Sequence, residues 1–161
     1  MARLLVVHHS PTPATLRLTE QVVAGAHDDA IEGVEVEVVA ALEVGRESTD
    51  RADGFLLGTS ANFGYMSGAL KHFFDQHFLT LGGALAADGS GTPTTGGRKP
   101  YGLWVHGRYD TTGAVRSVLS ITGALGWRQG YDVLEAMGDV DDVDLEAAYE
   151  LGGTIAALLT A

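Results

Sequence analysis

Short apolar runs and longer amphipathic segments follow one another along the chain. Residues 4–7 and 55–58 are continuous apolar runs, which are typical of strands buried on both faces. Residues 34–39 begin by alternating Val with Glu, as a strand near the edge of a sheet does. Residues 101–105 and 131–137 complete a set of five predicted strands.

Segments with helical spacing separate these strands. The predicted helices cover residues 12–26, 67–78, 113–127 and 143–159, and Leu16 is expected on the inner face of the first. Strands that alternate with helices predict an α/β fold of three layers, with a parallel sheet between helices. Five strands at this length favour the order 2-1-3-4-5.

Residues 79–100 are rich in Gly, Thr and Ala and show no periodicity, so they are predicted to form one long loop. Neither a repeat nor a linker is visible. The 161 residues, 45% of them hydrophobic, predict one domain over residues 1–161.

Composition and charge narrow the classes of function. The chain has no cysteine, which excludes disulfides and thiolate catalysis. Ten basic and twenty-one acidic residues give a net charge of −11, which argues against nucleic-acid binding. The charge is compatible with a basic protein partner, but many proteins are acidic without such a role. No signal-peptide pattern and no membrane-length apolar run is visible, so a cytoplasmic location without membrane association is expected.

Neither a metal centre nor a hydrolytic site is predicted. His72 and His77 are five residues apart on one helix, a poor spacing for a shared metal ion. Residues 58–62 lack the second glycine of a nucleophile elbow. The acidic run at residues 139–146 is expected to begin the last helix, where carboxylates suit the positive end of the dipole.

The passage from the first strand to the first helix carries three hydroxyl side chains, Ser10, Thr12 and Thr15. Backbone N–H groups at a helix N-terminus bind anions without any lysine or arginine. Serine and threonine are also common as ordinary helix caps. The motif therefore leaves a phosphate site and a simple cap open.

A longer and more distinctive segment, residues 58–76, follows the third strand. Its first part combines glycines, an amide and two aromatic side chains at the carboxyl end of a strand, where open parallel sheets bind ligands. This suits a flat, conjugated ligand. Its second part predicts a helix with Leu70, Phe73 and Phe74 in the core, and Lys71 and Asp75 paired on its surface.

These two motifs resemble a known family. Residues 58–76 resemble the Gly-Thr-Pro-x-x-Phe-Gly-x-Met-Ser-Gly-x-Leu-Lys-x-Phe-x-Asp pattern of tryptophan-repressor-binding-protein-like NAD(P)H:quinone oxidoreductases, within the flavodoxin-like FMN-binding proteins. Ser10-x-Thr12-x-x-Thr15 is similar to the flavodoxin phosphate loop, Ser/Thr-x-Thr-Gly-Asn-Thr. The resemblance implies a flavodoxin-like fold that binds FMN in three loops.

The resemblance also implies which residues contact FMN, with Gly64 nearest to flavin N5. A positive charge at His106 or Arg108 would favour the anionic reduced flavin. Core packing for the two aromatic residues, and an ordinary loop role for the two cationic ones, stay open. The implied contacts are Ser10, Thr12, Pro13, Ala14, Thr15, Ser60, Ala61, Asn62, Phe63, Gly64, Tyr65, His106, Gly107, Arg108 and Asp110.

One departure affects the phosphate loop. Pro13 and Ala14 replace the Gly-Asn of the pattern, and proline has no N–H to donate. A hydrogen bond to a charged group contributes about 1.5–3 kcal/mol, so the expected FMN affinity falls by one to two orders of magnitude.

Three hypotheses of function follow. The first is an NAD(P)H-dependent FMN oxidoreductase with a quinone-like or flavin acceptor, in which no protein side chain acts as catalytic acid or base. The second is a flavodoxin that carries single electrons between redox protein partners. The third is a cofactor-free binding module. A homo-oligomer is compatible with the first.

Overall fold

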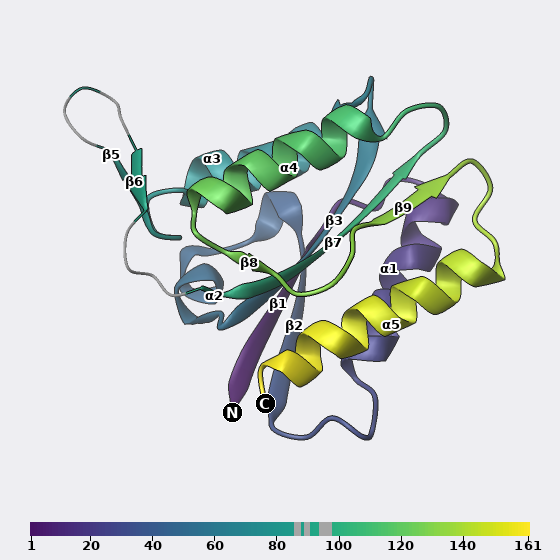
Figure 1. Ribbon diagram of the computed structural model, residues 1–161, viewed down its shortest axis with the longest axis horizontal. Helices are drawn as coiled ribbons and strands as arrows, with labels where there is room; N and C mark the ends of the chain where they lie inside the picture. The colour runs from purple at the N-terminus through teal and green to yellow at the C-terminus, as the bar shows by residue number, and fades with distance from the viewer. Residues whose placement is uncertain (86–87, 89–90, 94–97) are drawn as a thin grey trace.

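The structure is a computed structural model and describes residues 1–85, 88, 91–93 and 98–161 (Figure 1). Its centre is a parallel sheet in the order β2-β1-β3-β7, with β8 and β9 both pairing with β7 at the far edge. The predicted order 2-1-3-4-5 is therefore confirmed. The strands are β1 (Ala2–His8), β2 (Val34–Ala40), β3 (Gly54–Asn62), β7 (Pro100–Gly107), β8 (Arg128–Gln129) and β9 (Leu134–Met137).

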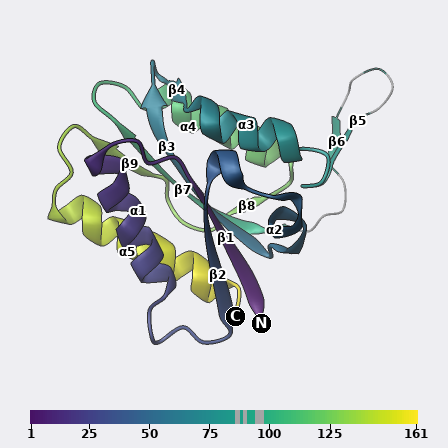
Figure 2. The same ribbon diagram turned by 180° about the vertical axis from the view of Figure 1, so that it is seen from behind.

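Helices cover both faces of the sheet. Figures 1 and 2 show α1 and α5 together on one face, and α3 and α4 together on the other. A short helix and a 3-10 turn connect β2 to β3. The helices are α1 (Pro13–Ala26), η1 (Ala41–Glu43), α2 (Arg46–Arg51), α3 (Gly68–His77), α4 (Thr112–Ala124) and α5 (Asp142–Leu158).

Each face of the sheet has its own hydrophobic core, because successive side chains of a strand point to opposite faces. On the α3 and α4 side, Phe55 stacks on Trp127 with ring centroids 4.1 Å apart. On the α1 and α5 side, Leu56 packs in a cluster with the buried Trp104 and Leu151. This confirms the apolar run of the third predicted strand as one buried on both faces.

Helices α1 and α5 approach each other closely through glycine. A Cβ atom at Gly152 would lie 1.9 Å from the Val22 carbonyl oxygen, and one at Gly25 would lie 1.9 Å from the Tyr149 carbonyl oxygen. Such distances leave no room for a side chain, so this helix pair depends on both glycines.

Three sequence predictions differ from the structure. Residues 79–100 contain a short antiparallel pair, β5 (Gly83–Leu85) and β6 (Gly91–Pro93), and are not one continuous loop. The helix predicted to reach residue 127 ends at Ala124, because Gly126 has a φ of +73°. Leu16 is 45% exposed, and Leu18 is the leucine of α1 that packs in the core.

Two further differences concern strands. The fifth predicted strand, residues 131–137, is regular only from Leu134, and the two-residue β8 precedes it. The third predicted strand continues to Asn62 and then turns back into β4 (Tyr65–Met66), which pairs with it antiparallel. This hairpin carries the implied FMN contacts at residues 60–65.

Candidate functional site

Three loops meet at one edge of the sheet, because β1, β3 and β7 are parallel neighbours. His8 lies opposite Gly58 in register, and Ser60 lies opposite His106. The His9 amide also donates to the Gly58 carbonyl at 3.0 Å. The loops that follow the three strands therefore share the carboxyl edge, where open α/β sheets bind ligands (Figure 2).

The β3–β4 hairpin turns through Phe63 and Gly64. Their φ angles are +52° and +78°, and Asn62 and Tyr65 pair on either side of them. A two-residue hairpin turn with φ positive at both positions suits the right-handed twist of the strands. Glycine accepts this conformation readily, whereas a bulky aromatic residue does so at a cost of about 1–2 kcal/mol.

Phe63 is fully exposed, and Tyr65 is 45% exposed, so neither aromatic residue of the hairpin packs in the core. The turn thus projects the Phe63 side chain into solvent from a backbone conformation that is unfavourable for a bulky residue. The alternative of core packing is therefore wrong for both residues.

Buried contacts hold the base of the hairpin. The buried Thr59 hydroxyl accepts a hydrogen bond from the Ser67 amide at 2.9 Å, and the Ser67 hydroxyl caps α3 through the Leu70 amide at 3.1 Å. A Cβ atom at Gly113 would lie 2.0 Å from the Gly64 carbonyl oxygen. The first turn of α4 and the tip of the hairpin are thus in direct backbone contact.

A cleft of about 480 Å³ opens between the hairpin and the loop that follows β7. Phe63 borders it from the hairpin, and Tyr109, which is 87% exposed, borders it from the other loop. Two exposed aromatic side chains beside backbone suit a flat ring that stacks between them. The lining residues are Ala61, Phe63, Gly64, Arg108, Tyr109 and Asp110.

Charged groups of the third loop are held by their neighbours. Asp110 accepts a hydrogen bond from the Thr112 amide at 2.9 Å, which holds the pKa of the Asp110 carboxyl below its usual value. The exposed Arg108 lies 3.4 Å from Asp139. The His106 Nε2 lies 2.7 Å from the Gly138 carbonyl oxygen, so it carries a proton and donates it there.

The first loop uses two of its three hydroxyl groups to build the start of α1. The Thr15 amide donates to the Thr12 hydroxyl at 3.2 Å, and the Thr12 amide donates to the Thr15 hydroxyl at 3.0 Å. The Thr15 hydroxyl also donates to the Thr12 carbonyl at 2.9 Å. The two hydroxyl oxygens lie 3.0 Å apart, and because the Thr15 hydroxyl donates its proton to the carbonyl, the Thr12 hydroxyl donates to the Thr15 oxygen. This reciprocal capping box therefore occupies both hydroxyl protons.

The hydroxyl of Ser10 is directed inward. Thr19 donates its hydroxyl proton to the Thr15 carbonyl at 3.0 Å, so its oxygen accepts from Ser10 at 2.7 Å. Ser10 in turn accepts from the Nδ1 of His8 at 2.9 Å. Burial, and the charge of His9, lower the pKa of His8, which keeps the ring neutral at pH 7. This chain of donors removes Ser10 as a donor to phosphate.

The backbone of the first loop offers few donors. Pro11 and Pro13 have no N–H, and the amides of Thr12 and Thr15 are taken by the capping box. Within the part of the chain that the structure describes, the Ser10 and Ala14 amides have no protein acceptor. These two amides, at the positive end of the fourteen-residue α1, are what the loop presents to an anion.

The sequence identified most of the lining of the cleft but missed Tyr109. The only available signal was its place between Arg108 and Asp110 in a strand-end loop. Other implied residues lie outside the cleft. The Ser60 hydroxyl donates to the Asn62 side chain at 2.8 Å, Gly107 is buried against Ala61, and Tyr65 lies on the far side of the hairpin.

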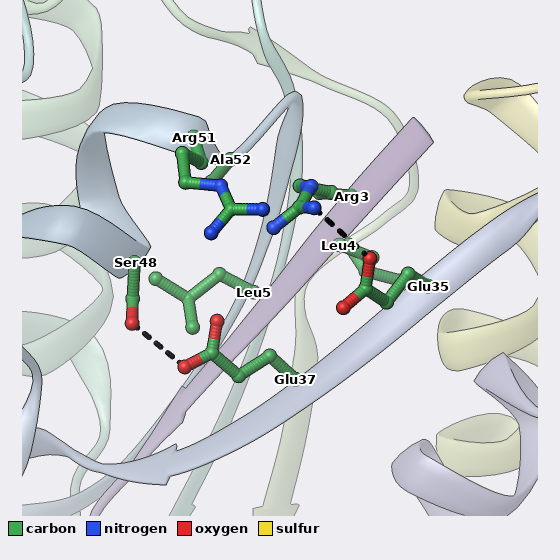
Figure 3. Close-up of a pocket in the computed structure, with 8 residues that line it drawn as sticks. All are labelled: Arg3, Leu4, Leu5, Glu35, Glu37, Ser48, Arg51 and Ala52. Carbon is green, nitrogen blue, oxygen red and sulfur yellow. Dashed lines mark hydrogen bonds and ion pairs between the residues drawn. The ribbon is translucent and has the colours of Figure 1, made fainter. Parts of the chain in front are cut away.

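A second, charged pocket lies near the amino ends of β1 and β2 (Figure 3). Arg3 lies 3.4 Å from Glu35, and Ser48 donates to Glu37 at 2.7 Å, so α2 is tied to the edge strand. The pocket has a volume of about 10 Å³, which admits about one water molecule. We interpret this pocket as a structural link between α2 and the sheet.

None of the helices among the described residues has the length and hydropathy of a membrane-spanning segment. No group of three or more His, Asp or Glu side chains in the same residues has the geometry to hold a metal ion.

Solved structures resemble the chain along nearly its whole length. A flavodoxin from the domain Archaea matches with a TM-score of 0.80 and 18% identity, over 99% of both chains. The chain has the flavodoxin-like fold. A WrbA-like flavodoxin from Agrobacterium tumefaciens matches with a TM-score of 0.73 and 22% identity, over 99% of this chain and 98% of that one.

The sequence comparison is narrower. A flavodoxin of Aquifex aeolicus (strain VF5) is 33% identical over 85 residues, which cover 53% of this chain and 45% of that protein. The chain thus spans just under half the length of this relative. No family model matches the chain.

Proposed function

We propose that the chain binds one FMN in the cleft between the β3–β4 hairpin and the loop after β7. The observation that supports this is the presence of two exposed aromatic side chains, Phe63 and Tyr109, at one cleft. A flavin ring stacked there would bury both of them. Burial by a ligand would offset the strain in the backbone of Phe63.

The residues present fit the ring of FMN better than its phosphate. Gly64 brings backbone to the edge of the cleft with no side chain in the way. At the phosphate loop, the Ser10 and Ala14 amides are the donors that remain among the described residues. We therefore expect FMN to bind more weakly than it would to a loop with a full set of amides.

We further propose that the chain is an NAD(P)H-dependent oxidoreductase with a quinone-like or flavin acceptor. Bound FMN would accept a hydride from NAD(P)H and pass two electrons to the acceptor. The protein would bind and orient these molecules and place the charges of Arg108 and Asp110 beside the ring. The pattern of residues 58–76 and the fold shared with a WrbA-like flavodoxin support this choice.

A one-electron carrier between redox proteins is the second candidate. The partial match to a flavodoxin and the net charge of −11 favour it, because a strongly acidic surface steers a protein toward basic partners. Anaerobic stopped-flow mixing of the FMN-loaded protein with NADPH separates the two. Rapid bleaching of the flavin absorbance is expected, and reduction only after a partner reductase is added would select the carrier.

The first experiment is a titration of the apo protein with FMN, followed by the quenching of flavin fluorescence. We expect saturable binding in the micromolar range. No binding at hundreds of micromolar FMN would overturn both redox candidates and favour a cofactor-free module.

A further inference from the structure

His8 is the last residue of β1, and its side chain lies behind the first loop. Like Leu4 and Val6, it points to the face of the sheet that α1 covers. There the Nδ1 of His8 lies 2.9 Å from the Ser10 hydroxyl oxygen. The amide of Ser10 is one of the two that the loop presents to an anion. The imidazole ring therefore lies next to the candidate phosphate position.

The hydrogen bonds behind the loop determine which nitrogen of His8 carries a proton. Thr19 donates its hydroxyl proton to the Thr15 carbonyl, and Ser10 donates its own to Thr19. The oxygen of Ser10 therefore accepts from His8, so the Nδ1 of His8 is protonated. In the neutral ring Nε2 is then the unprotonated nitrogen. A second proton can bind at Nε2 without breaking this chain of hydrogen bonds.

The surroundings of His8 keep it neutral in the free protein. Across the sheet His8 lies opposite Ala40 and Gly58, neither of which carries a charge, and the buried side chains of α1 are uncharged as well. Burial of the ring, and the charge of the neighbouring His9, lower the pKa of His8. His8 is therefore neutral near pH 7, and no carboxylate among the described residues offsets this effect.

The first loop lacks a full positive charge. Residues 8–15 contain no Lys or Arg, and the guanidinium group of Arg17 on α1 donates to the Val140 carbonyl at 3.3 Å. The phosphate of FMN carries about two negative charges near pH 7. The free amides and the dipole of α1 supply only partial charges. A cation that forms when phosphate binds would add an interaction that the loop does not offer in its free state.

We propose that His8 takes up a proton when the phosphate group of FMN binds to the first loop, and that it supplies the positive charge which this loop otherwise lacks. The proposal rests on the FMN site proposed above. A bound anion favours the charged form of a nearby histidine, which opposes the effects of burial and of His9. By linkage, the same proton strengthens the binding of the phosphate, so the affinity for FMN depends on pH through His8.

The test is titration of the wild type, His8→Asn and His72→Asn with FMN at about pH 6 and about pH 8, where histidine changes its charge. Asparagine has an amide nitrogen near the place of Nδ1, so it keeps a donor for Ser10 and removes the titration. His72→Asn is the matched control, since His72 is exposed on α3, on the other face of the sheet. At about pH 6 the wild type and the control should bind FMN about three- to tenfold more tightly than His8→Asn, the effect of one charge on a partly solvated phosphate. At about pH 8 all three should be equal.

Two further measurements assign the effect to the phosphate and to a proton. Riboflavin, which has the same ring and no phosphate, should bind equally well to all three proteins at both pH values, and its binding also shows that His8→Asn is folded. Calorimetric titration with FMN in two buffers of different ionisation enthalpy counts the protons taken up on binding. The wild type should take up more than His8→Asn, and the comparison between proteins cancels the titration of the FMN phosphate itself.

The outcomes separate this inference from the proposed function. Equal FMN affinity and equal proton uptake in the wild type and His8→Asn at both pH values would overturn the role of His8. A pH effect for riboflavin as large as that for FMN would also overturn it, because the proton would then respond to the ring. Both results leave the FMN site standing. Binding of neither flavin by the wild type would overturn the FMN site and this inference with it.

Discussion

Replacing Pro13 by alanine should strengthen the binding of FMN. Pro13 is the first residue of α1, where a backbone N–H has no partner within the helix and can point at an anion. Proline removes this donor, and alanine restores it without changing the helical tendency of the first turn. The capping box of Thr12 and Thr15 is left intact.

The size of the gain follows from the donors that remain. The loop presents the Ser10 and Ala14 amides, so a third amide is a large addition. A hydrogen bond to a charged group contributes about 1.5–3 kcal/mol, which corresponds to about a tenfold to hundredfold lower Kd for FMN. The alanine variant should lose up to about 1 kcal/mol of stability, because proline restricts the unfolded chain.

The assay is titration with FMN and, in parallel, with riboflavin, which has the same ring system but no phosphate. FMN affinity should rise in Pro13→Ala, and riboflavin affinity should stay at its wild-type value. Pro11→Ala is the control, since it restores an amide that precedes the helix. A parallel change for both flavins, or no change for either, would refute the view that Pro13 limits phosphate binding.

Three further predictions concern single positions. Phe63→Asn should stabilise the protein by about 1 kcal/mol in thermal melts, because Asn tolerates a positive φ. The same change should lower the affinity for FMN about two- to tenfold in a titration, because the stacking ring is lost. An unchanged FMN affinity would contradict a stacking role for Phe63. Gly152→Ala should destabilise the fold by about 3 kcal/mol, because its Cβ would overlap the Val22 carbonyl. Gly153→Ala is the control, since the atom nearest to its Cβ would be 3.3 Å away. Urea titrations should show a much smaller loss of stability for Gly153→Ala than for Gly152→Ala. Because the pKa of His8 is lowered from 6.5 in the folded state, unfolding should become easier as the pH falls below about 6.5, when the unfolded chain binds the proton first. His8→Gln should flatten this dependence in urea titrations at neutral and mildly acidic pH, and an equal slope in both proteins would count against it.

The buried strands and the helices were predictable because both depend on local patterns, whereas the order of the strands followed from a general rule for alternating strands and helices. The run around Phe55 is apolar at successive positions, and a strand with helices on both sides requires that. Helix starts were equally local. Asp141 caps α5 together with Asp144, as the acidic run predicted, and Ser67 caps α3. These elements form from interactions a few residues apart, so their signals can be found in the sequence alone.

Only the tertiary structure decided what the site residues do. Phe63 and Tyr109 come together because β3 and β7 are adjacent in register and a left-handed turn directs Phe63 outward. The hydroxyl of Ser10 was an expected donor to phosphate, but it donates inward to the hydroxyl of Thr19, which lies in α1. Sequence spacing determines which element a side chain belongs to. Where that side chain points, and which partner takes its proton, depends on packing between elements that lie far apart in the chain.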